Sequence, residues 1–434
     1  MLSLFQNKKS IGGKIKLNTM SHIKRYLKTV GNFSGNARSF LGCILLSFIA
    51  LGAIQVILGL YVLELNFAED VFGMIVSARI IATGLMAIPM GALHQKIGSK
   101  RILLLAALLG GGSLISMGLT GNKTILVLTN FLFGSSFAIL FVMIGPFLTN
   151  NSNSQQREKL FSFNFVLMTI ARTIGTFLVG FLPTIFIRTI LTKRATDLHI
   201  YRTILYTLGA IFLLAIIPLS FIKESKKKEH KDGDKQIKIV NGLKTERIRN
   251  LSLYQLLFGI GSGLVTPFFS VFLAKQIGFS TGQLSSIMFV YRILMAVAFI
   301  ITPILTRKIG KVKTVGITQV SSLPFLLAIV LVPNFAIVSF AFLIRGALGN
   351  IARPIASNFA MEITNKSEQT ITSSLMRTSK SLARGGSATV AGWIITNFGY
   401  QVTYYLTFIF YLGSALLFLN SFLEIEKKQL NYNS

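Results

Sequence analysis

Long apolar stretches dominate this sequence. Twelve segments of about 20 residues or more are rich in Leu, Ile, Val and Phe, and short polar stretches separate them. About 20 such residues are needed for a helix to cross the hydrocarbon core of a bilayer. The pattern therefore predicts an all-α membrane protein with twelve transmembrane helices. The predicted spans are Phe40–Leu63, Val71–Leu93, Arg101–Thr120, Thr124–Leu148, Leu160–Ile187, Tyr201–Ile222, Leu251–Ala274, Thr281–Leu305, Val312–Val332, Phe335–Ile363, Thr370–Asn397 and Val402–Phe422.

The twelve predicted helices fall into two groups of six. A charged and polar stretch that contains KESKKKEHKDGDK lies between the groups and has the composition of a linker. We therefore predict a basic tail at 1–37, a first six-helix bundle at 38–222, a linker at 223–250, a second six-helix bundle at 251–423 and a second tail at 424–434.

The two groups also resemble each other in sequence. Matching residues recur at nearly one offset, and the basic turns KIGSKR and KIGKVK are among them. Several matches around a central linker indicate a duplicated six-helix unit, so the two bundles are expected to be pseudo-symmetric. The matching pairs are Gly98/Gly310, Gly134/Gly346 and Arg172/Arg384, each 212 residues apart, and Arg79/Arg292, 213 apart.

One predicted span, Gln369–Asn397, breaks the apolar pattern because it carries three cations. At 100° per residue these cations share one narrow helix face with two serines. A cation at membrane depth costs about 2.5 kcal/mol or more, so the stripe is expected to face a wet cavity lined by protein. The alternative is a cytoplasmic amphipathic helix, or a span end with snorkelling side chains. The stripe comprises Ser373, Arg377, Lys380, Arg384 and Ser387.

Composition supports a membrane protein and argues against a soluble protein, a nucleic-acid-binding protein and an enzyme. Of 434 residues, 52% are hydrophobic and only 13% are charged, about half the share of a soluble domain. The net charge of +30 would suggest a nucleic-acid partner in a soluble protein. Here the cations lie in short connections between apolar runs, as the positive-inside rule describes, so no nucleic acid is expected. The single cysteine, four scattered histidines and the lack of a G-x-x-x-x-G-K-[ST] motif favour a non-enzyme without cofactor or metal.

The basic connections set the expected orientation. They include both tails, the central linker and the turns around Lys100 and Lys311, whereas the opposite connections hold Glu64, Glu69 and Asp70. We therefore expect both termini to be cytoplasmic, in the cell membrane of a bacterium. The loop between the fifth and sixth predicted helices is an exception, because it is basic but would lie on the outer side.

The turn after the second helix reads GALHQKIGSKR, residues 91 to 101. It resembles the G-x-L-a-D-R-x-G-r-K-r signature of the major facilitator superfamily, and PILTRKIGKVK after the eighth helix is similar to its second copy. The resemblance covers nearly the whole chain. It implies two six-helix bundles that rock about a central site and open alternately to each side. The gate residues that it implies are Gly91, Gln95, Lys96, Gly98, Lys100, Arg101, Lys308, Gly310 and Lys311. The sequence departs from the signature at its carboxylate, which is replaced by Gln95 in the first turn and by Arg307 in the second.

Candidate binding residues lie deep in the predicted spans. Arginines sit near the middle of five spans, and the sequence places no carboxylate at the same depth. Guanidinium groups bind carboxylate or phosphate through two hydrogen bonds, so these side chains are candidates for holding an anion. The alternative is a structural role, in which they bond backbone carbonyls between the bundles. The candidates are Arg79, Arg172, Arg292, Arg345 and Arg384, with Arg377, Lys380, Gln55 and Asn130 as further polar residues.

These features predict a monomeric secondary transporter for a small solute in the lipid bilayer. The leading hypothesis is an anionic substrate: an organic phosphate, a carboxylate or an anionic headgroup. The alternatives are efflux of multiple drugs or amphipathic compounds, and a non-transporting membrane sensor or scaffold. Proton coupling usually relies on a buried carboxylate or histidine, and neither lies at the middle of a predicted span, so the coupling ion stays open.

Overall fold

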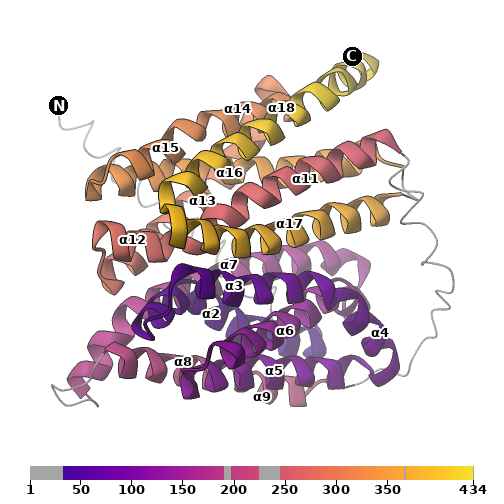
Figure 1. The fold of residues 1–434 in the computed structure, drawn as a ribbon. Coiled ribbons are helices and arrows are strands. Elements are labelled where there is room, and N and C mark those ends of the chain that lie inside the picture. Colours follow the sequence, from indigo (N-terminus) through magenta and orange to yellow (C-terminus); the bar gives the residue numbers. More distant parts are fainter. Residues whose placement is uncertain (1–32, 190–196, 224–244, 366–367, 434) are drawn as a thin grey trace, which may run out of the picture.

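The structure is a computed structural model that describes residues 33–189, 197–223, 245–365 and 368–433. The described chain folds into long helices that run roughly alongside one another, and these ranges contain no strand (Figure 1). The predicted all-α membrane fold is confirmed. Most of the basic tail predicted at 1–37 and of the linker predicted at 223–250 lies outside the described residues.

The helices form two halves of the chain, and each predicted span coincides with one helix or with an interrupted helix. The first half contains α2 (Gly35–Glu64), α3 (Glu69–Leu85), α4 (Ala87–Ile97), α5 (Ser99–Leu119), α6 (Lys123–Asn150), α7 (Ser154–Thr189), α8 (Asp197–Leu213) and α9 (Ile216–Ser220). The second half contains α11 (Glu246–Val265), the 3-10 turn η1 (Thr266–Phe268), α12 (Phe269–Ile277), α13 (Thr281–Ile309), α14 (Lys311–Ser321), α15 (Leu323–Leu331), α16 (Phe335–Ile363), α17 (Gln369–Phe398) and α18 (Tyr400–Asn433).

Length and composition identify most of these helices as membrane spans. Ten described helices or helix pairs are long and apolar enough to cross a bilayer, and the pair α3 and α4, bent by 51°, makes an eleventh. Helix α17 has 30 residues but is not among them. Its cations lower its mean hydropathy. The helix is therefore long enough to cross a bilayer but too polar to be identified as a span by composition.

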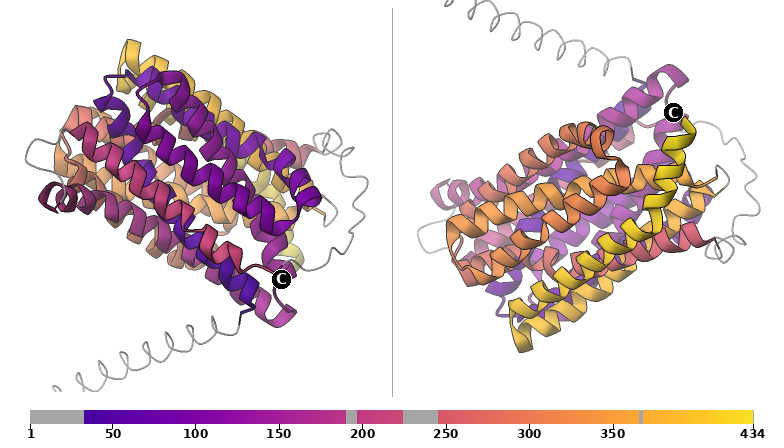
Figure 2. Two further views of the ribbon diagram at one scale, coloured as in Figure 1. Left: turned by 90° about the horizontal axis from the view of Figure 1, so that it is seen from below. Right: turned by 90° about the horizontal axis from the view of Figure 1, so that it is seen from above.

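The two halves pack side by side, with α3 and α7 of the first half facing α17 and α13 of the second (Figure 1). Views from opposite sides bring each half to the front in turn (Figure 2). The turns at Gly98 and Gly310 lie at one end of the molecule, here called the basic end. Glu69 and Asp70, at the start of α3, lie at the other, the acidic end. The glycines adopt φ angles of 86° and 87°, a conformation that residues with a Cβ rarely adopt.

Glycines also let neighbouring helices approach at the backbone of the buried arginines. A Cβ atom at Gly52 of α2 would lie 2.1 Å from the carbonyl oxygen of Arg172 in α7. In the second half, a Cβ at Gly263 of α11 would lie 2.3 Å from the carbonyl oxygen of Arg384 in α17. Small residues at such crossings are typical of membrane helix packing. In each half, a close glycine contact from a neighbouring helix therefore positions the backbone of the buried arginine.

We predict that Gly52→Ala lowers the thermal unfolding midpoint of the purified protein. Inserting a methyl group into a tightly packed contact costs about 1–3 kcal/mol. Gly112→Ala is the control, because nothing lies within 4 Å of its Cβ position; its midpoint should equal or exceed that of the wild type. Equal midpoints for the two variants would contradict the close approach of α2 and α7.

Candidate functional site

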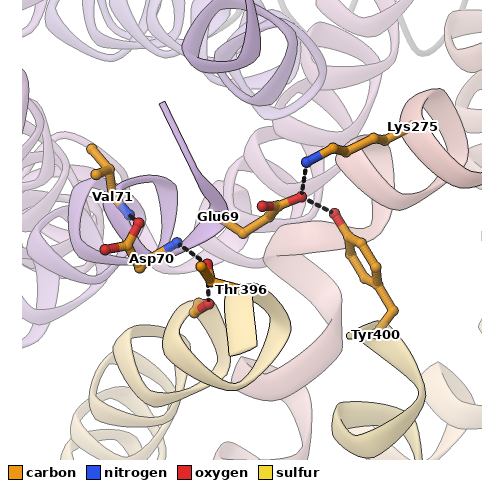
Figure 3. A network of polar contacts seen from close by, with 7 residues as sticks. Glu69, Asp70, Val71, Lys275, Thr396 and Tyr400 are labelled. Carbon is orange, nitrogen blue, oxygen red and sulfur yellow. Dashed lines mark hydrogen bonds and ion pairs between the residues drawn. The ribbon is translucent and has the colours of Figure 1, made fainter. Parts of the chain in front are cut away.

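A cluster of polar contacts joins the two halves at the acidic end (Figure 3). Glu69 is only 6% exposed, and its Oε1 accepts hydrogen bonds from Lys275 Nζ at 2.6 Å and Tyr400 Oη at 3.1 Å. The backbone N–H of Asp70 donates to Thr396 Oγ1 at 3.1 Å. Because α3 belongs to the first half and α12, α17 and α18 to the second, these five residues form a latch between the halves, here called the acidic-end latch.

Close helix packing extends the contact of the latch toward the middle of the molecule. A Cβ at Gly392 of α17 would lie 2.5 Å from the carbonyl oxygen of Glu69, and one at Gly73 of α3 would lie 2.7 Å from that of Ala388. Further along, Ser77 Oγ donates to the carbonyl of Gly385 at 2.7 Å. Helices α3 and α17 are therefore in continuous contact from the acidic end to the depth of the arginines, and this end is closed.

At the basic end, the predicted gate residues make contacts within one half only. Lys100 Nζ donates to the carbonyl of Ser220 at 2.6 Å in the first half. In the second half, Lys311 forms an ion pair with Glu362, and Glu426 accepts hydrogen bonds from the backbone N–H groups of Lys311 and Val312 at the start of α14. A carboxylate at a helix N-terminus is favourable because of the helix dipole. Four other gate side chains are exposed: Gln95, Lys96, Arg101 and Lys308.

Arg292 of α13 reaches from the second half into the first. Its Nε donates to Thr176 Oγ1 of α7 at 3.1 Å, and its Nη2 donates to Gln55 Oε1 of α2 at 3.0 Å. Thr176 Oγ1 in turn donates to the carbonyl of Arg172 at 2.9 Å. Two candidates from the sequence, Gln55 and Arg292, are therefore in direct contact across the interface.

The four pseudo-symmetric arginines form two like-charged pairs, each with one member from each half. The charges of Arg79 and Arg384 repel each other, as do those of Arg172 and Arg292. Arg172 stacks over the Phe48 ring at 4.8 Å. Within the described residues, buried N–H groups on Arg79 (Nη1), Arg172 (Nε) and Arg384 (Nε) have no hydrogen-bond acceptor. A buried donor without an acceptor is unfavourable, so each of these groups lacks a stabilising hydrogen bond in this conformation.

Three more cations lie beside the arginine pairs. Arg353 of α16 and Lys380 of α17 lie over the Phe258 ring, at 5.8 Å and 4.9 Å from its centroid. Arg377 of α17 lies 5.9 Å from the ring centroid of Phe141 in the first half. The charge of Arg353 also disfavours the charges of Arg172, Lys380 and Arg384. Sequence reasoning did not select Arg353, although it lies one helical turn beyond Asn350 on α16.

No carboxylate offsets this positive charge among the described residues. The ion pairs in this part of the chain lie at the two ends: Glu69 with Lys275, and Glu362 with Lys311. The remaining two candidates lie apart from the group. Asn130 is fully buried and donates to the carbonyl of Leu126, within α6. Arg345 lies over the Tyr411 ring of α18, inside the second half.

Comparisons with known proteins agree with this arrangement. The family model described as Major Facilitator Superfamily matches the chain twice, at residues 40–251 and 251–433. The multidrug resistance protein MdtG of Salmonella schwarzengrund (strain CVM19633) is 34% identical over 131 residues, which are 29% of this chain and 32% of that protein. The match thus spans about a third of that relative's length.

Solved structures share the fold at low sequence identity. The nucleoside transporter NupG superposes with a TM-score of 0.74 at 13% identity, over 90% of this chain and 99% of NupG. An inward-facing, occupied bacterial homologue of the human lysosomal transporter Spinster also gives 0.74 at 13% identity, over 89% and 97%. A D-xylose–proton symporter gives 0.68 at 14% identity, over 91% and 97%. Together with the two matches to the family model, the duplicated six-helix architecture shows that this chain belongs to the major facilitator superfamily of membrane transporters.

Proposed function

We propose that the chain is a secondary transporter that moves a small organic anion, such as a phosphate or carboxylate, across the membrane. The observation that carries this proposal is the group of cations between the halves. Three of its arginines carry buried N–H donors without acceptors, and no described carboxylate pairs with the group. Because guanidinium groups bind oxyanions through charge-assisted hydrogen bonds, an anion would satisfy both the donors and the charge.

Alternating access accounts for the different states of the two ends. The acidic-end latch closes one end, whereas the gate residues of the basic end contact only their own half. The basic end is cytoplasmic by the positive-inside rule, so this conformation opens toward the cytoplasm. We place the protein in a bacterial cell membrane, as a monomer with both termini inside. It acts there without a cofactor and without enzymatic activity.

Efflux of amphipathic drugs is the second candidate function. The name of the Salmonella relative favours it, although that similarity covers less than a third of this chain. In that case the arginines would be structural, as Arg292 is in part through its bonds to Gln55 and Thr176. The unpartnered N–H groups of Arg79, Arg172 and Arg384 favour the anion instead.

We predict that Arg384→Gln slows the uptake of a transported organic phosphate or carboxylate into proteoliposomes by about tenfold or more, since a charged hydrogen bond contributes about 1.5–3 kcal/mol. Glutamine removes the charge and keeps a side chain that can still donate and accept hydrogen bonds. Lys313→Gln removes an exposed charge at the basic end and should leave the rate unchanged. Uptake of lipophilic cations alone, or wild-type rate and affinity in Arg384→Gln, would reject the anion hypothesis.

We also predict that Glu69→Gln opens the acidic end more often. Removing one partner of a buried charge pair costs about 2–5 kcal/mol, so a cysteine placed between the halves should react about tenfold faster or more with a membrane-impermeant maleimide. Ser270→Cys provides this reporter because Ser270 is 3% exposed and packs against Gly59 of the first half. The native Cys43 is buried.

Glu362→Gln is the matched control for that experiment. It removes a carboxylate from an ion pair that lies within the second half. The reporter at position 270 should then react at the same rate as in the Ser270→Cys parent. Equal rates in the Glu69→Gln and Glu362→Gln variants would show that the acidic-end latch does not hold the halves together.

A further inference from the structure

Two corresponding stretches of the duplicated unit have the same pattern of side-chain burial. Residues 162–170 of α7 correspond to 374–382 of α17 at the offset of 212 that relates the halves. Position by position, the two stretches have the same sequence of exposed, partly buried and buried side chains. Asn164 and Met376 are the buried positions, and Phe165 and Arg377 are exposed positions. The two stretches therefore occupy equivalent environments in their halves.

The chemistry of the two stretches differs at four central positions. Four consecutive residues of α7, Phe165-Val166-Leu167-Met168, are apolar. Their counterparts in α17, Arg377-Thr378-Ser379-Lys380, are polar or basic. Phe165 is 62% exposed and Val166 is 43% exposed. Phe165 lies about two helical turns before Arg172, on the face of α7 that meets the cations of the second half.

Helices α6 and α16 show the same division. The buried residues Phe147 and Phe359 correspond at the offset of 212, which fixes the register. Six residues before this pair, Phe141 of α6 corresponds to Arg353 of α16. Likewise Pro146 corresponds to Asn358. The first half thus presents an apolar wall from α6 and α7, and the second half presents a basic wall from α16 and α17.

The two walls face each other across the interface between the halves. The guanidinium carbon of Arg377 lies 5.9 Å from the ring centroid of Phe141, one residue from each wall. Arg353 of the basic wall also acts electrostatically on Arg172 of α7. At this point of the interface, basic side chains of the second half therefore lie opposite an aromatic side chain of the first half.

We infer that the substrate is an amphipathic organic anion, with its anionic group on the basic wall and its apolar body on the apolar wall. This inference rests on the proposed transport of an anion and narrows its substrate class. A small hydrophilic anion would leave Phe165 and Val166 unused, whereas an apolar body would remove them from water. A lipophilic cation would meet Arg353, Arg377 and Lys380 as like charges.

The test compares ligands that share a headgroup and differ in their apolar body. Methyl phosphate and 1-naphthyl phosphate are titrated against the full-length protein in nanodiscs, with 1-naphthol and tetraphenylphosphonium as uncharged and cationic comparators. The naphthyl ester should bind at least about tenfold more tightly than the methyl ester, because affinity rises with the apolar area removed from water. Both comparators should bind more weakly than 1-naphthyl phosphate.

Variants of the two walls separate the contributions. Phe165→Ser should weaken 1-naphthyl phosphate about fivefold to tenfold and leave methyl phosphate unchanged, since it removes apolar surface only. Arg353→Gln should weaken both esters, because it removes charge from the basic wall. Lys313→Gln, an exposed charge outside the walls, should change neither. The exposed position of Phe165 makes a folding defect in its variant easy to exclude by the thermal unfolding midpoint without ligand.

The outcomes distinguish this inference from the proposed function. If the two esters bind equally and Phe165→Ser affects neither, the amphipathic substrate class is wrong while anion transport stands. If 1-naphthol and tetraphenylphosphonium bind as tightly as 1-naphthyl phosphate, the anion proposal fails as well. Binding of neither ester would contradict both.

Discussion

Positive charge held between two helical bundles is the constraint on which the rest of this structure depends. Each cation at membrane depth costs about 2.5–3.5 kcal/mol, and the cross-interface pairs Arg79/Arg384 and Arg172/Arg292 repel. The halves are joined in spite of this repulsion, by the acidic-end latch and by the bonds of Arg292 to Gln55 and Thr176. An anion between the halves would supply the missing negative charge. In the proposed function, binding of the anionic substrate therefore reduces the repulsion between the halves and favours their movement toward each other.

Gene duplication has preserved the packing of this chain more closely than its chemistry. The glycine contacts at Arg172 and Arg384 repeat in the two halves, as do the burial patterns of α7 and α17. The side chains at exposed positions have diverged into an apolar and a basic set. Packing constrains buried positions because a single extra carbon collides with a neighbouring backbone, whereas exposed positions are free to acquire a binding role. The asymmetry between the halves is thus where substrate recognition is expected.

The sequence predicts the helices well because their signals are local. Apolar length gives the spans, glycine gives the turns at Gly98 and Gly310, and the offset of 212 pairs the arginines. The latch was missed because Glu69 and Lys275 are 206 residues apart and no local pattern connects them. Asn130 looked like a cavity residue, but its side chain is fully buried and bonds the carbonyl of Leu126 in its own helix. Arg353 became a site residue only when packing placed it over the Phe258 ring that Lys380 also contacts.

The central claim is that an anion draws the two halves together around the buried cations. Spin labels at Gln95→Cys and Arg307→Cys report on it directly, because both positions are exposed at the basic end, in opposite halves, and Cys43 is buried. The label-to-label distance should shorten when a saturating organic phosphate is added and should not respond to an equal concentration of tetraphenylphosphonium. A distance that the phosphate leaves unchanged would contradict the account.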